Sequence, residues 1–160
     1  MTVRKMQMDD KEKIAGFYAA MGEQSTHFFN VNHGNEKRTM EFFENGKKDH
    51  VFYVAFDGEE LIALAFIWDI NRTVPWFGIA VRDSAQGKGV GTAFLRAILD
   101  DIFFAGYAGL LLRTAQDNIP AQRLYEKCGF ERLGVHPSGE YLYLKRFARN
   151  QNDDRKSGLQ

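Results

Sequence analysis

The sequence predicts an α/β (α+β) fold with a mixed, mostly antiparallel central sheet of about seven strands and helices on both faces. Two observations lead to this prediction. Paired apolar runs within residues 50–70 and 130–145 are separated by turn residues, which indicates antiparallel hairpins. The strand–helix–strand succession within residues 74–114 indicates a right-handed crossover, which makes its two strands parallel.

Length and composition favour a single domain. A chain of 160 residues with 44% hydrophobic residues and 14 Phe can bury a large core. We expect the domain to span residues 1–147. Residues 148–160 are expected to form a flexible tail, because the last ten residues are polar and have no apolar period.

Charge and cysteine content exclude several function classes. Lys+Arg and Asp+Glu both number 21, and this neutral balance gives no support to a nucleic-acid or anionic-membrane partner. The N-terminus has no secretion signal and no apolar run is long enough to span a bilayer, so we expect a cytoplasmic protein. The single cysteine, Cys128, cannot form an internal disulfide or a cysteine-rich metal site, and no metal is expected.

The first third of the chain predicts a strand, a helix and a long connection. Residues 3–8 are the candidate first strand. Asp9 or Asp10 can cap the following helix, whose apolar residues recur at helical spacing, and Gly22 would end it. Residues 22–48 are expected to be irregular, with a second helix from about 36 to 44. A connection this long and aromatic is uncommon unless it binds a ligand.

The middle of the chain predicts a hairpin and a third strand. Strands at 50–56 and 60–70 flank Asp57-Gly58, which favours a type I′ turn because such a turn needs positive φ at both central residues. The next strand is expected at 74–81. Pro75 lies near its start, where a missing N–H is tolerated.

The last third predicts two helices and three strands. A helix over 90–104 and a strand over 110–114 complete the crossover. Asn118 or Asp117 can cap a short helix with Pro120 in its first turn, and Gly129 would end that helix. Strands at 130–135 and 140–145 form the final hairpin.

The glycine-rich segment 86–92 is the most informative part of the chain. It reads Gln-Gly-Lys-Gly-Val-Gly-Thr and lies between a predicted strand and a predicted helix. Its glycines allow positive φ and close approach of a ligand to the main chain. The free N–H groups at the helix start, with the helix dipole, favour a negatively charged group. The segment therefore predicts a site for a phosphate-bearing ligand.

Two common nucleotide-binding motifs fit this segment poorly. The P-loop pattern places a hydroxyl residue directly after its Lys, whereas Gly89 follows Lys88 here. Counted from Gly87, the dinucleotide pattern ends in Gly, whereas Thr92 takes that place, and antiparallel hairpins do not belong to that fold.

A third pattern does fit. Gln86, Gly89 and Gly91 match [QR]-x-x-G-x-[GA], and residues 118–130 match N-x-x-A-x-x-x-Y-x-x-x-G-F. Together the two motifs resemble the GNAT superfamily of acyl-CoA-dependent N-acetyltransferases, and the resemblance extends over about residues 3–145. Two features depart from it. Asp83 stands where the family often has proline, and the strand before the loop lacks the glutamate that often serves as general base.

The resemblance implies acetyl-CoA as cosubstrate. Its diphosphate would lie on the loop amides, and its pantetheine arm would add beside strand 74–81, which in relatives diverges from strand 110–114. Asn118 would contact the cosubstrate as well as cap its helix. The cofactor-binding residues expected on these grounds are Ile79, Ala80, Val81, Gln86, Gly87, Lys88, Gly89, Val90, Gly91, Thr92, Asn118 and Tyr125.

Catalysis by direct transfer needs an acid and a base. The resemblance implies that Tyr125 protonates the departing thiolate, although its spacing also fits a core tyrosine. An alkylammonium must lose a proton before it attacks. The candidate bases by position are Asp69, Glu41 and His27, and His33 lies in the same aromatic segment. Cys128 falls on an apolar helix face, which favours a core thiol over a nucleophile.

The sequence therefore predicts an enzyme that moves an acetyl group to an amine in a ternary complex. Two alternatives stay open: a non-catalytic acetyl-CoA-binding sensor, and a nucleotide-binding domain of another family. The sequence leaves three acceptor classes open: a small-molecule amine, a peptide amine and a protein lysine. A homodimer is compatible with the resemblance.

Overall fold

The computed structural model describes residues 1–30 and 34–148. One mixed sheet of seven strands runs through it in the order β1-β2-β3-β4-β5-β7-β6, which confirms the predicted fold class. All neighbouring strands are antiparallel except β4 and β5, which are parallel. The strands are β1 (Thr2–Lys5), β2 (His50–Asp57), β3 (Glu60–Trp68), β4 (Trp76–Val81), β5 (Gly109–Thr114), β6 (Glu131–Val135) and β7 (Tyr141–Arg146).

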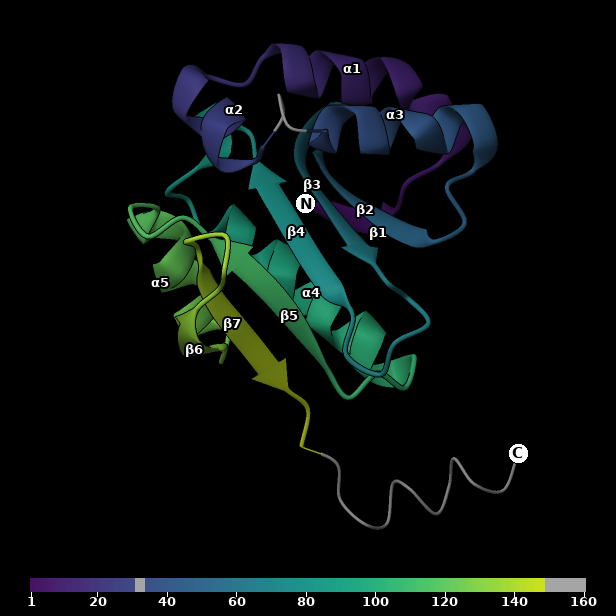
Figure 1. Ribbon diagram of the computed structural model, residues 1–160. Coiled ribbons are helices and arrows are strands. Elements are labelled where there is room, and N and C mark those ends of the chain that lie inside the picture. Colours follow the sequence, from purple (N-terminus) through teal and green to yellow (C-terminus); the bar gives the residue numbers. More distant parts are fainter. Residues whose placement is uncertain (31–33, 149–160) are drawn as a thin grey trace, which may run out of the picture.

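Helices cover both faces of the sheet (Figure 1). The helices are α1 (Lys11–Ala19), α2 (Glu23–Phe28), α3 (Asn35–Asn45), α4 (Val90–Phe104) and α5 (Ile119–Lys127). Because side chains alternate along a strand, β2 contributes side chains to two separate hydrophobic cores, one on each face of the sheet. Phe52 and Val54 pack with α1 and α3, whereas Tyr53 and Ala55 pack on the side of α4 and α5. Across residues 1–30 and 34–148, no helix is both long and apolar enough to span a membrane.

Several predicted elements differ from the structure. The segment 22–48 is not mostly irregular, because α2 forms within it and α3 is longer than the helix expected at 36–44. The β2–β3 turn is not type I′. Asp57 pairs with Glu60, which leaves Gly58 and Glu59 as the central residues, and of these only Gly58 has positive φ. Of the predicted tail 148–160, all but Ala148 lies outside the described residues, as does His33.

Neither predicted aspartate caps α1 with its side chain. Asp10 occupies the cap position, but its buried carboxylate instead accepts two hydrogen bonds from Arg4, both at 2.8 Å, and one from the main-chain N–H of Gln7. The pair ties β1 to the start of α1.

The parallel strands β4 and β5 separate soon after they meet. Their only register pair is Trp76 with Leu111, at the first residue of β4, and an additional main-chain hydrogen bond joins Leu111 to Pro75 just before it. From Phe77 to Val81 the edge of β4 has no strand partner on this side. The two strands therefore part toward their carboxyl ends (Figure 1), as the sequence motifs led us to expect.

Candidate active site

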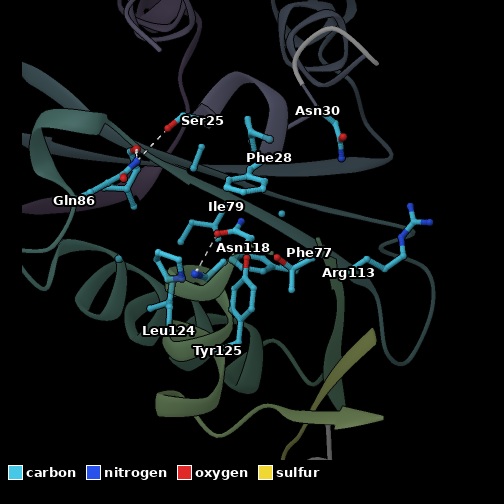
Figure 2. Close-up of a pocket in the computed structure, with 18 of the residues that line it drawn as sticks. Ser25, Phe28, Asn30, Phe77, Ile79, Gln86, Arg113, Asn118, Leu124 and Tyr125 are labelled. Carbon is cyan, nitrogen blue, oxygen red and sulfur yellow. Dashed lines mark hydrogen bonds between the residues drawn. The ribbon is translucent and has the colours of Figure 1, made fainter. Parts of the chain in front are cut away.

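A cleft of about 660 Å³ opens where β4 and β5 part. The carboxyl half of β4 and the glycine loop line one part of it, α5 another, and α2 and α3 close it from the other face of the sheet (Figure 2). Ligands in α/β sheets commonly bind at such a point, beyond the carboxyl ends of parallel strands.

The glycine loop has the geometry that the sequence predicted. Gly87 and Gly89 adopt positive φ of 72° and 81°, and Gly89 is the N-cap of α4. None of the main-chain N–H groups from Gly87 to Thr92 donates a hydrogen bond to another described residue. Helix starts leave such donors unsatisfied, and the helix dipole adds a partial positive charge there. The loop can therefore receive phosphate oxygens.

Most of the predicted cofactor-binding residues line the cleft. These are Ile79, Ala80, Val81, Gln86, Gly87, Gly89, Gly91, Thr92, Asn118 and Tyr125. Lys88 and Val90 do not line it. The ammonium group of Lys88 donates to the carbonyl of Ser84 at 2.9 Å, along the exposed side of the loop.

Gly91 lies where helix α4 faces α5. A Cβ atom there would come within 3.3 Å of Leu124 and 3.5 Å of Val81, both of which also line the cleft. Small size at this position thus keeps open the cleft between the loop and α5.

Tyr125 lies in the floor of the cleft. Its ring packs at 5.8 Å from Phe130 and 5.9 Å from Tyr143, and the residue is 6% exposed. The hydroxyl points up toward Asn118 and Ile79 (Figure 2), and it has no hydrogen-bond partner in the described chain. Burial, followed by the charges of Tyr143 and Glu140, raises the pKa of Tyr125 above its ordinary value. The phenol therefore stays protonated at neutral pH and is available as a donor.

Asn118 is the N-cap of α5, as predicted. Its Oδ1 accepts from the N–H of Ala121 at 3.4 Å, and Pro120 lies in the first turn. The cap fixes the start of the helix that carries Tyr125.

Asp83 connects the glycine loop to α2. Its carboxylate accepts from the N–H of Gly22 at 2.9 Å and from the hydroxyl of Ser25 at 2.6 Å. Gln86, from the same loop, donates its side-chain amide to the carbonyl of Val81 at 2.9 Å and to Ser25 at 3.3 Å. The loop thereby holds α2 against one end of the cleft.

The three bases suggested by position do not line the cleft. Asp69 lies in the turn after β3 with positive φ, and its nearest cation is Arg72 at 3.8 Å. Glu41 pairs with Lys47 at 2.8 Å on α3. His27 lies on α2 with its ring against Phe28. The geometry gives none of them support as the base.

Sequence reasoning missed the carboxylates that do line the cleft. Among the described lining residues these are Asp117 and Glu140. Glu140 is half-buried just before β7, and its Oε1 accepts from Ser138 at 3.2 Å. The turn of the β6–β7 hairpin lies beside the carboxyl end of β5. The acidic residue Glu140 at this turn was therefore the sequence feature that could have indicated a carboxylate in the cleft.

Cys128 is a core thiol. It ends α5, is 7% exposed and packs in the cluster on the α4–α5 side of the sheet. Burial raises its pKa, which disfavours the nucleophilic thiolate.

The comparisons with known proteins assign the family. The sequence profile of the acetyltransferase (GNAT) family matches residues 11–130. The chain belongs to the GNAT family. Among relatives, N-alpha-acetyltransferase RimI of Mycobacterium tuberculosis is 36% identical over 91 residues, 54% of this chain and 56% of the relative. An uncharacterised protein of Mycobacterium leprae is also 36% identical, over 55% of this chain and 26% of the relative. The chain thus spans between about a quarter and just over half of these two curated relatives.

Solved structures share the GNAT fold over almost the whole chain. The GNAT domain of PAT from S. lividans superimposes with a TM-score of 0.77 at 19% identity, covering 91% of this chain and 89% of the other. An N-acetyltransferase from Thermoplasma acidophilum, solved in complex with coenzyme A, gives 0.73 at 15% identity, covering 91% and 98%. At these identities the likeness shows the fold alone.

Proposed function

We propose that this protein is an N-acetyltransferase that moves the acetyl group of acetyl-CoA to an amine by direct attack in a ternary complex. The observation that carries the proposal is the cleft itself. Unsatisfied loop amides lie at one end, an unpaired strand edge runs along it, and a protonated tyrosine hydroxyl lies in its floor. The N-acetyltransferase activity named for the RimI relative supports the same chemistry.

Each part of the cleft matches a part of the cosubstrate. The loop amides from Gly87 to Thr92 would hold the diphosphate. The free edge of β4 from Phe77 to Val81 would hydrogen-bond the pantetheine amides as an added strand does. The thioester would then lie near Tyr125, where the sulfur can take up a proton as it departs.

The reaction balances with one acid and one base. An ammonium acceptor loses a proton to a base, and its nitrogen then forms the N–C bond while the C–S bond breaks. The sulfur takes a proton from Tyr125, and the proton that the nitrogen loses as the amide forms restores the Tyr125 phenol, while the base releases its proton to solvent. Glu140 is the carboxylate that we assign as base, because it lines the cleft and its charge acts on Tyr125. The raised pKa of Cys128 supports direct transfer over an acyl-enzyme.

A thiol-release assay tests the proposal. Purified protein is mixed with acetyl-CoA and a panel of amines, and free CoA is measured. Acceptor-dependent release that falls strongly in Glu140→Gln, at unchanged acetyl-CoA affinity, is the expected result. Tight CoA binding with no release for any amine would show a sensor instead, and preference for ATP or NAD over CoA would show another ligand class. A cytoplasmic location and a homodimer stay predictions of the sequence.

A further inference from the structure

Two arginines lie over a pair of stacked indole rings at one side of the cleft. Arg38 comes from α3, and its Cζ is 4.8 Å from the ring centroid of Trp68. Arg113 comes from β5, and its Cζ is 5.5 Å from the ring centroid of Trp76. The two indoles stack at 6.1 Å with 14° between their planes. The four residues form a continuous row, which we call the Arg–Trp row, and Arg38, Trp68 and Arg113 line the cleft.

Neither arginine of this row is directly paired with a carboxylate of the described residues. The polar contact of Arg113 is with Nδ1 of His136 at 3.3 Å. Burial lowers the pKa of half-buried Arg38; the charges of Asp49, Tyr18 and Glu41 act in the opposite sense, and the smaller effect of Arg113 lowers it. Two like charges close to each other are electrostatically unfavourable unless an anion binds between them.

The Arg–Trp row lies at the acceptor end of the cleft. In Figure 2, Gln86 and Ser25 mark the end near the glycine loop, Tyr125 lies between, and the guanidinium of Arg113 rises at the opposite side. The diphosphate of the cosubstrate is already assigned to the loop amides. An anion bound by Arg38 and Arg113 therefore belongs to the other substrate.

We propose that the acceptor is a small amine that carries a carboxylate, as a free amino acid does, and that Arg38 and Arg113 bind this carboxylate. The inference rests on the proposed acetyltransferase function and adds its substrate class. An indole under the flat face of a guanidinium leaves its N–H edges available, in Arg113 those that do not contact His136, and a guanidinium edge matches a carboxylate through two parallel hydrogen bonds. With the carboxylate held there, the amino group can extend toward Glu140 and Tyr125.

Matched acceptor pairs test the inference. Each L-amino acid of a panel is compared with its α-amide, which keeps the amine and side chain but lacks the negative charge. We expect kcat/KM for the preferred acids to exceed that for their amides about 10- to 100-fold, the range for charged hydrogen bonds. Arg113→Gln and Arg38→Gln should remove most of this preference by raising KM for the acid, with little change for the amide. Arg113→Lys keeps the charge but loses the paired N–H donors of the guanidinium, so its acid preference should lie between those of the wild type and Arg113→Gln.

Arg132→Gln is the matched control. Arg132 also lies over an aromatic ring, that of Tyr141 at 4.3 Å, but it does not line the cleft, so the acid preference should persist in this variant. Arg113 is exposed, so its variants test the inference even if Arg38→Gln folds poorly. Acids and amides acetylated equally well would overturn the inference and leave the acetyltransferase function standing. A raised KM for acetyl-CoA in both arginine variants, with acid preference intact, would also overturn it. No CoA release with any acceptor would overturn the function as well.

Discussion

The carboxylate of Asp83 accepts a hydrogen bond from the main-chain N–H of Gly22 at 2.9 Å, across 61 residues of sequence. Gly22 is the N-cap of α2, which has no side-chain cap of its own, and Asp83 from another segment anchors the start of this helix. A Cβ atom on residue 22 would collide with the Asp83 carboxylate, which explains glycine there. The glycine loop and the helix over the cleft are therefore directly linked.

Replacement of Asp83 should impair folding stability and substrate binding by similar free energies. Asp83→Ala removes the bonds to Gly22 and Ser25, which together should cost about 1–2 kcal/mol because both are exposed. Since Ser25 and Phe28 of α2 line the cleft, we expect KM values to rise about 10-fold, a loss of the same size in free energy. Steady-state kinetics and urea unfolding measure the two effects. Asp100→Ala, on the exposed side of α4, is the control, and an equal rise in KM there would contradict this role.

Short segments with strong local chemistry could be predicted from the sequence. The positive φ of Gly89, the cap by Asn118 and the proline in the first turn of α5 each depend on only a few neighbouring residues. The seven strands could be predicted for a similar reason, because apolar runs and turn residues mark them locally.

Features that depend on contacts distant in sequence could not be predicted. Helix α2 has the polar sequence Glu-Gln-Ser-Thr-His-Phe with no apolar period, and Asp83 anchors its start from the loop after β4. Glu140 and Arg113 reach the cleft because β7 pairs with β5. The hypothesis that Asp69 is the base gains no support, because Trp68 at the end of β3 lines the cleft but Asp69 in the following turn does not.

Replacement of Tyr125 by Phe should slow the chemical step alone. The phenol packs in the core through its ring, and its hydroxyl has no partner in the described chain, so folding should be little changed. Because a thiolate leaves fairly well unaided, we expect kcat to fall about 10- to 100-fold with KM for acetyl-CoA unchanged. An unchanged kcat in Tyr125→Phe would show that Tyr125 is only a core residue.

The pH profile gives a second readout of Tyr125. Its pKa is raised above the ordinary value of about 10, so the neutral form persists beyond the pH at which a free phenol ionises. The rate should therefore show no loss from phenol ionisation up to about pH 10. A falling limb well below that pH, absent from Tyr125→Phe, would show that the hydroxyl ionises too early to be the acid.

Any side chain at position 89 should lower stability and CoA affinity. Its φ of 81° disfavours an L-residue by about 1 kcal/mol, and a Cβ there points into open space where the diphosphate is proposed to bind. Gly89→Ala should therefore lower both stability and CoA affinity, the latter by about 10-fold, equivalent to one lost charged hydrogen bond. Calorimetric titration with CoA measures the affinity.

Gly16→Ala is the matched control for Gly89→Ala. Gly16 lies inside α1, where a Cβ atom meets nothing within 4 Å, so alanine should raise stability by about 0.5–1 kcal/mol and leave CoA affinity unchanged. Equal CoA affinities for Gly89→Ala and Gly16→Ala would contradict the role of the loop.

The Arg4–Asp10 pair should make stability depend on acid pH. The hydrogen bonds from Arg4 hold the pKa of Asp10 below its ordinary value. The pair therefore contributes fully above the ordinary carboxyl pKa, and its contribution is lost as pH falls through the lowered value. Asp10→Asn should cost about 1–2 kcal/mol at neutral pH, and its difference from the wild type should shrink below about pH 4.

Urea unfolding of Asp10→Asn and wild type between about pH 7 and about pH 3 measures this dependence. Asp9→Asn is the control, because Asp9 is the exposed neighbour and its loss should change stability by no more than about 0.5 kcal/mol. A stability difference for Asp10→Asn that stays constant across the range would show that its charge is not involved.

A crystal structure with coenzyme A bound tests the central claim most directly. We predict diphosphate oxygens about 3 Å from main-chain nitrogens between Gly87 and Thr92, with the sulfur within hydrogen-bond reach of the Tyr125 hydroxyl. The pantetheine arm should run along β4 from Phe77 to Val81. A diphosphate bound away from the loop, or a sulfur outside the cleft floor, would contradict the account.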